Sequence, residues 1–165
     1  MSKKPSHPTL PVSLTQTDFA AIAEHCYRVT SAVVAEGGVV APIVIAGTCR
    51  NGNLEVSYTS LVAVRSDRDK NRIARFMQKL AQRPRFDFVV HITEAWILIG
   101  PNLPTGSIAQ HPQRQEAVLF NILSKDCQTV VINPLHRTPS RLERGRVNFD
   151  MEVQGRFVRP TPARN

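Results

Sequence analysis

The chain has 165 residues, of which 42% are hydrophobic, and this length is sufficient for one domain with a buried core. No apolar run approaches the roughly 18 residues of a membrane-spanning helix, and the first residues lack the apolar segment of a secretory signal. The three cysteines, Cys26, Cys49 and Cys127, are odd in number and lack metal-ligand spacing. These features predict a cytoplasmic protein with free thiols and without a cofactor, a metal or a membrane segment.

The formal net charge is +8, and it is unevenly distributed. Residues 1–64 contain four basic and four acidic side chains, so the whole excess lies in residues 65–165. An asymmetry of this kind indicates an acidic partner, either nucleic acid or an acidic protein surface.

Residues 1–14 contain three prolines and are expected to form an extended arm. A helix is predicted to follow, because Thr15–Asp18 offers caps and apolar residues then recur at spacings of three and four up to Gly37-Gly38. Its expected buried face consists of Phe19, Ile22, Cys26, Val29 and Val33. Two β-rich runs come next, residues 39–49 and 54–64, and the Asn51-Gly52 pair between them is the strongest short signal for a β-hairpin.

Ser66-Asp67 predicts the start of a second helix that runs to about Gln82, ahead of Pro84. Its apolar stripe consists of Ile73, Phe76, Met77 and Leu80. Five basic residues also recur at spacings of three and four, and at about 100° per residue they gather in a narrow stripe of their own. They are Arg68, Arg72, Arg75, Lys79 and Arg83. The pattern predicts a helix with one buried face and a strongly basic outer face.

The longest apolar run spans residues 86–99 and is closed by Gly100-Pro101-Asn102. Its richness in β-branched and aromatic residues indicates a strand. Alternate side chains are apolar on both faces, which predicts a central strand covered at least in part on both sides. Glu94 interrupts one of these faces, and His91 lies on the opposite one.

Further strands are expected near residues 114–123, 129–133 and 147–153, the last of them at an edge and preceded by a Pro- and Arg-rich loop over 134–146. The resulting order is α-β-β-α-β-β-β-β. It predicts an α+β domain over residues 15–158, with a single mainly antiparallel sheet of five to six strands and two helices packed on it. Residues 159–165 are expected to form a flexible tail.

A carboxylate on a buried strand face must be paired, protonated or open to a cleft. If the next strand is a neighbour, Arg114 or His111 could reach Glu94. One interpretation is therefore a structural role for Glu94, either in an ion pair, with Arg114 as the preferred partner, or in hydrogen bonds from backbone donors of the loop 101–112. The other is an acid–base site of the hydrolase type, made of Glu94, His111, Arg114 and Glu116, with Trp96 nearby. A metal centre is disfavoured, because His91 points away from Glu94.

The hairpin, the helix after it, the strand with Glu94-Ala95-Trp96 and the next strand's start, His111-Pro112-x-Arg114-x-Glu116, resemble a loose group of small prokaryotic and phage proteins of unknown function. The resemblance covers roughly residues 40–133, with Gln113 at a position where an acidic residue is expected. It implies a single α+β domain in which the residues of the possible acid–base site form one connected cluster. It implies no activity.

The sequence therefore favours a small cytoplasmic binding protein of phage or mobile-element type, without catalysis. The residues expected to contact nucleic acid or an acidic protein are Arg68, Arg72, Arg75, Lys79, Arg83, Arg141, Arg144 and Arg146. Aromatic residues make up only 6% of the chain and mostly occupy predicted core positions, which favours phosphate contacts over sequence reading. A hydrolase built on Glu94 and an inhibitor or assembly partner of a host complex are the alternatives, and the sequence is compatible with an oligomer.

Overall fold

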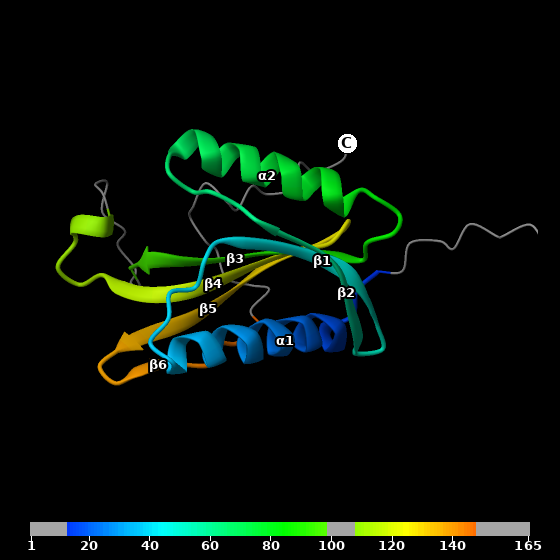
Figure 1. Ribbon diagram of the computed structural model, residues 1–165. Helices are drawn as coiled ribbons and strands as arrows, with labels where there is room; N and C mark the ends of the chain where they lie inside the picture. Colours follow the sequence, from blue (N-terminus) through cyan, green and yellow to red (C-terminus); the bar gives the residue numbers. More distant parts are fainter. Residues whose placement is uncertain (1–12, 99–107, 148–165) are drawn as a thin grey trace, which may run out of the picture.

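The computed structural model describes residues 13–98 and 108–147, which form three layers with one helix on each face of a sheet (Figure 1). The sheet has six strands in the order β2-β1-β3-β4-β5-β6, and all neighbouring strands are antiparallel. The predicted α+β class is therefore confirmed. No helix in the described part is long and apolar enough to cross a membrane. The elements are α1 (Gln16–Ala35), β1 (Ile43–Arg50), β2 (Asn53–Leu61), α2 (Asp67–Ala81), β3 (Phe88–Ile97), the short 3-10 helix η1 (Ile108–Gln110), β4 (Gln115–Leu123), β5 (Gln128–Arg137) and β6 (Ser140–Leu142).

The hairpin between β1 and β2 turns at the predicted residues. Asn51 has φ 53° and Gly52 has φ 77°, the positive values at both central positions that a tight type I′ turn requires. The turn is fastened to the start of α1, because the Asp18 carboxylate accepts a hydrogen bond from Gly52 N at 2.9 Å. Asp18 also completes a capping box with Thr15, so the cap of α1 lies within the run Thr15–Asp18 that was predicted to supply it.

Helix α1 buries a face that differs in part from the predicted one. Val29 and Val33 were expected in the core, yet they are 54% and 37% exposed, and Thr30 and Val34 are buried in their place. The cause is the path of the helix. It starts at the hairpin and ends beside β6, where the Ser140 hydroxyl donates to Val34 O at 2.6 Å. Its last turns therefore rest on the β6 side of the sheet, and the opposite flank of the helix is left uncovered.

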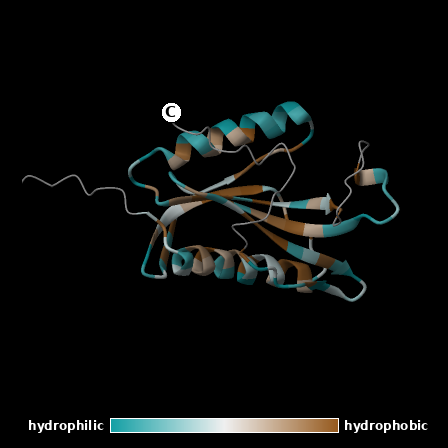
Figure 2. Cartoon of the chain, turned by 180° about the vertical axis from the view of Figure 1, so that it is seen from behind, coloured by the Kyte–Doolittle hydropathy of each residue, from teal (hydrophilic) through white to brown (hydrophobic). Residues whose placement is uncertain are grey.

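Strand β3 lies in the middle of the sheet and contributes to two cores. Phe88, Val90 and Ile92 pack in the cluster that includes the residues of α1, whereas Val89 packs in the cluster that includes those of α2. The prediction of a central strand covered on both faces is confirmed. Hydrophobic colour in Figure 2 is concentrated on the strands and on the inner sides of the helices, and the outer side of α2 is hydrophilic.

The sixth strand is not where the sequence placed it. The segment 134–146 was expected to be a loop, but β5 continues through Pro134 to Arg137 and β6 follows at residues 140–142. A proline usually ends a strand because it cannot donate to the ladder. Here the side chain of the preceding Asn133 supplies a cross-strand bond, donating from Nδ2 to Val118 O at 3.0 Å. Val147 is not in a strand. The rest of the predicted strand, like the predicted arm up to residue 12 and the tail, lies outside the described residues.

Candidate functional site

Helix α2 begins and ends close to its predicted bounds. Ser66 is the N-terminal cap, and its hydroxyl accepts a hydrogen bond from Asp69 N at 3.3 Å. Two aspartates lie in the first turn, near the positive end of the helix dipole, and Lys79 lies in the last turn. Ile73, Met77 and Leu80 are buried against the sheet. This anchoring fixes which side of α2 faces outward.

The outward side carries the predicted basic stripe, called here the basic row: Arg68, Arg72, Arg75, Lys79 and Arg83. All five residues are exposed. Arg72 forms an ion pair with Asp69 at 2.8 Å, but no acidic side chain of the described residues forms an ion pair with the other four. From Arg68 to Lys79 the row extends for about 16 Å along the helix axis. Three of these four cations are thus held on one rigid helix, Arg83 follows directly after its C-terminal cap, and all four stay available to an external anion.

The first half of the basic row borders an open concavity on the surface of α2. Its described lining is polar or charged throughout: Arg68, Asp69, Asn71, Arg72 and Arg75. Phe76 of α2 and Tyr58 of β2 pack against the core beneath the helix and contact each other with ring centroids 6.2 Å apart. The described surface of the helix therefore offers guanidinium groups for phosphates and no ring on which a base could stack.

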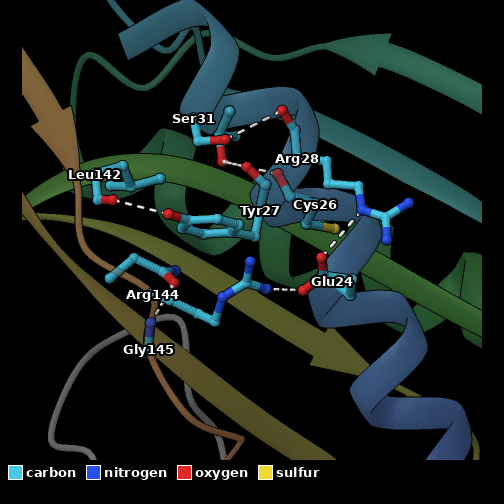
Figure 3. A network of polar contacts seen from close by, with 10 residues as sticks. Glu24, Cys26, Tyr27, Arg28, Ser31, Leu142, Arg144 and Gly145 are labelled. Carbon is cyan, nitrogen blue, oxygen red and sulfur yellow. Dashed lines mark hydrogen bonds and ion pairs between the residues drawn. The ribbon is translucent and has the colours of Figure 1, made fainter. Parts of the chain in front are cut away.

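The other three predicted binding residues belong to β6 and the segment after it: Arg141, Arg144 and Arg146. This segment packs against α1, on the side of the sheet away from α2 (Figure 1). Figure 3 shows that the Arg144 guanidinium forms an ion pair with Glu24, and it also lies 4.1 Å from the ring centroid of Tyr27. The Tyr27 hydroxyl in turn donates to Leu142 O at 3.0 Å. Arg144 and Arg146 therefore lie beside α1 and apart from the basic row, and Arg144 serves to fasten its own segment to α1.

The segment that carries these arginines is held close to β5 by its backbone. Glu143 N donates to Pro134 O at 2.9 Å, and Gly145 N donates to Asn133 Oδ1 at 2.9 Å. A Cβ atom on Gly145 would lie 2.1 Å from Ile132 O, so no other residue fits at this position without a shift. The close approach explains why the arginines lie beside α1 rather than around the basic row.

Glu94 has a partner that the sequence did not indicate. Its Oε2 accepts from Arg137 Nη2 at 2.9 Å, and its Oε1 accepts from Val40 N at 2.8 Å. Arg137 also donates from Nε to Glu116 Oε2 at 3.2 Å. The predicted ion pair exists, but the choice of Arg114 as the partner was wrong. Both oxygens of Glu94 are engaged in joining β3 to β5 and to the link between α1 and β1.

The remaining members of the possible acid–base site are turned to other contacts. The Arg114 guanidinium lies 4.6 Å from the ring centroid of Trp96 and donates to His111 O at 3.2 Å. His111 Nδ1 accepts from Gln113 N at 3.1 Å within the same turn. The expected single cluster is thus divided, with the two glutamates bridged by Arg137 and His111 held within its own turn. Over residues 13–98 and 108–147, no group of three or more His, Cys, Asp or Glu side chains is placed to hold a metal ion.

The buried titratable groups are held in unreactive states. Burial alone would raise the pKa of the Asp18 carboxyl, but hydrogen bonds from Thr15, Gly52 and Cys49 outweigh it and hold that pKa below its usual value. Burial lowers the pKa of His91 to about 4, so its imidazole is neutral at physiological pH. Burial raises the pKa of Cys26 to about 12, and burial together with the charge of Asp18 does the same for Cys49. Neither thiol supplies the thiolate that a nucleophile needs.

The chain matches no protein-family model, no curated protein and no solved structure. Its function is therefore inferred from the described side chains alone. The basic row and the Glu94 cluster differ in one decisive respect. Four cations of the row have no acidic partner within the described residues, whereas Glu94 and Glu116 share Arg137 as their common counter-charge.

Proposed function

We propose that the protein is a non-catalytic binding protein that holds nucleic acid by its phosphates through the basic row of α2. The observation that supports this proposal most strongly is that Arg68, Arg75, Lys79 and Arg83 are exposed and lack an ion pair with any described acidic side chain. In a chain with a net charge of +8, such a row attracts polyanions and releases their counterions on contact.

The composition of the row favours contact with the phosphate backbone. Three of the four unpaired cations are arginines, whose planar guanidinium groups bind phosphate oxygens in a bidentate manner. The described outer side of α2 has no aromatic ring for stacking, because Phe76 packs against Tyr58. Contacts of this kind position a protein on nucleic acid and carry little sequence information. We therefore expect binding that tolerates changes of sequence.

The hydrolase alternative is less well supported by the same contacts. A general acid or base needs a free oxygen or nitrogen within reach of a substrate. Both oxygens of Glu94 accept hydrogen bonds within the protein, and Glu116 is bound to the same Arg137. His91 is fully buried and, as a strand neighbour three positions from Glu94, belongs to the opposite face of the sheet.

Charge reversal on the row tests the proposal. The variant Arg75→Glu/Lys79→Glu should lose affinity for a labelled duplex or single strand by about tenfold or more at low salt, measured by fluorescence anisotropy. The matched control is Arg141→Glu/Arg146→Glu, which changes the net charge equally at exposed positions on β6 and in the segment after it. The control should bind nearly as well as the unmodified chain, and circular dichroism should show both variants folded.

Three outcomes would refute the proposal. No binding by the unmodified chain at low salt would exclude nucleic acid and leave an acidic protein surface as the ligand of the row. Equal losses in both variants would mean that the overall charge, rather than α2, attracts the polyanion. Undiminished binding by the row variant would place the contact elsewhere on the molecule.

A further inference from the structure

One corner of the molecule carries exposed apolar side chains. Four of the five large apolar residues that are exposed in the described part are Val29 (54%), Val33 (37%), Val39 (71%) and Leu61 (73%). Val33 lies against Gly38 in the link after α1, so closely that a Cβ atom on Gly38 would be only 2.9 Å from Val33 Cγ1. Leu61 pairs with the first residue of β1, four positions after Val39. The corner thus runs from the end of α1 along the link to β1 and on to the end of β2 (Figure 1).

The two valines of α1 lie on the flank that the sheet leaves uncovered. At about 100° per residue, Val29 and Val33 fall beside Ile22 and well away from Tyr27. Tyr27 is bonded to Leu142 of β6, so the flank with the valines faces the opposite end of the sheet, where β1 and β2 lie. The link between α1 and β1, which carries Val39, connects this flank to the edge of the sheet.

That edge is strand β2, which pairs with β1 on one side only within the described residues. Edge strands of monomeric proteins are usually kept short or carry lysine, proline or inward charge. The opposite edge, β6, follows this rule with three residues, of which one is Arg141. Strand β2 has nine residues and contains no lysine, arginine or proline. A register shift opposite Ala46 and Gly47 interrupts its pairing near Ser57, which leaves Tyr58–Leu61 as the regular exposed stretch.

Charge indicates what could cover this corner. Between Val29 and Val64 the only basic residue is Arg50, against two acidic residues. Arg50 lies at the far end of β1, where its Nε is 3.7 Å from Asp87. Two copies of a chain with a charge of +8 repel each other at most approaches, but not at a surface without positive charge. Among the described residues, the corner is therefore a surface where a second copy meets little repulsion.

We propose that two copies of the chain associate through β2, pairing antiparallel about a two-fold axis, with the apolar corner packed beside the new ladder. Such an interface is self-complementary, because the same edge and the same patch are used on both copies. A register centred on Thr59 pairs Tyr58 with the partner's Ser60 and leaves the one charged residue of β2, Glu55, outside the paired stretch. The backbone groups of the edge are then satisfied by an identical strand.

The pairing has a consequence for the basic row, and this part rests on the proposed function. The two-fold axis of an antiparallel strand pair is perpendicular to the sheet, so both α2 helices lie on the same face. Helix α2 packs over β1, β3 and β4, with β3 in the middle, which places the two helices about five strand spacings apart, on the order of 24 Å. Two basic rows on one face can then bind one nucleic acid molecule together. Once the first row is bound, the second is held near the same molecule at a high effective concentration, so the dimer binds more tightly than one chain does.

The mass in solution without nucleic acid tests the pairing independently of the proposed function. Sedimentation from micromolar to submillimolar concentration should give twice the 18.4 kDa of the chain. The variant Val33→Lys/Leu61→Lys should give 18.4 kDa with an unchanged circular dichroism spectrum, because both side chains are exposed. The control Ala20→Lys/Gln78→Lys adds the same charge at exposed positions outside the corner and should keep the doubled mass.

An unmodified chain of 18.4 kDa at the highest concentration would overturn the proposal, and so would a doubled mass in the corner variant. If the chain is monomeric while its β2 amides are protected from hydrogen exchange, another part of the same chain covers the edge and the proposal is likewise wrong. The Arg75→Glu/Lys79→Glu variant should remain a dimer. A monomer in that case would place the interface on α2 and contradict the assignment to β2.

Discussion

Acidification should destabilise the protein through His91, which is fully buried in the middle of β3. Burial lowers the pKa of His91 from 6.5 to about 4 in the folded chain, whereas in the unfolded chain the imidazole regains its ordinary pKa. Between these values the unfolded state binds a proton that the folded state does not, so the free energy of unfolding falls as the pH falls. The slope is about 1.4 kcal/mol per pH unit, which amounts to about 3 kcal/mol by pH 4. Above pH 6.5 both states are neutral, and His91 adds no pH dependence.

Urea unfolding followed by circular dichroism, at about pH 7.5, 6, 5 and 4.5, measures this slope. The control is His91→Leu, an uncharged side chain of similar size that cannot titrate. All other titrating groups are common to the two proteins, so the difference between their slopes belongs to His91. Below pH 6.5 the unmodified chain should lose about 1.4 kcal/mol per pH unit more than the variant does. Equal slopes would refute the reasoning, because the imidazole would then be able to take up a proton in the folded state.

Three further predictions concern stability, measured as the free energy of unfolding in urea. Gly52→Ala should cost about 1–2 kcal/mol, because residue 52 has a left-handed backbone conformation that alanine adopts only with strain. Gly52→Asn should cost less, because asparagine tolerates that conformation, and equal costs for the two variants would contradict the turn geometry. Arg137→Met should cost about 2 kcal/mol, since it leaves Glu94 without its counter-charge. Arg114→Met should cost less than about 1 kcal/mol, because it removes the contact with the Trp96 ring, and the reverse order of costs would identify Arg114 as the partner of Glu94. Asp18→Ala should cost about 3 kcal/mol through the lost cap and hairpin bonds, and a cost below about 0.5 kcal/mol would mean that these bonds do not hold α1 to the hairpin. In the unmodified chain, the part of this contribution that depends on the charge of Asp18 should be lost as the pH falls from 3.8 through the lower pKa of the folded chain.

The features that the sequence predicted correctly depend on neighbouring residues. Thr15 and Ser66 cap the two helices as expected, because a cap acts on backbone groups within three positions. The Asn51-Gly52 turn follows from the tolerance of both residues for positive φ. The spacing of the basic residues places them on one side of a single helix, so the exposure of the basic row could be inferred once Ile73 was assigned to the buried side.

The features that the sequence did not reveal depend on pairing between distant segments. Arg137 lies 43 positions from Glu94, and only the register of β3, β4 and β5 brings the two together. The periodicity of α1 continues through Val29 and Val33, but the spacing of residues cannot tell where the sheet beneath a helix ends. Pro134 suggested a loop, because the compensating bond comes from a neighbouring side chain that the pattern does not show.

The salt dependence of binding tests most directly whether the basic row contacts phosphates. For the unmodified chain, the logarithm of the binding constant should fall linearly with the logarithm of the salt concentration. Removing two contacts with Arg75→Gln/Lys79→Gln should reduce the steepness by about 0.9 per residue on duplex DNA, or about 0.7 on single strands. The control Arg141→Gln/Arg146→Gln should keep the original slope. A row variant with an unchanged slope would contradict the account, because neither side chain would then be replacing a counterion on the nucleic acid.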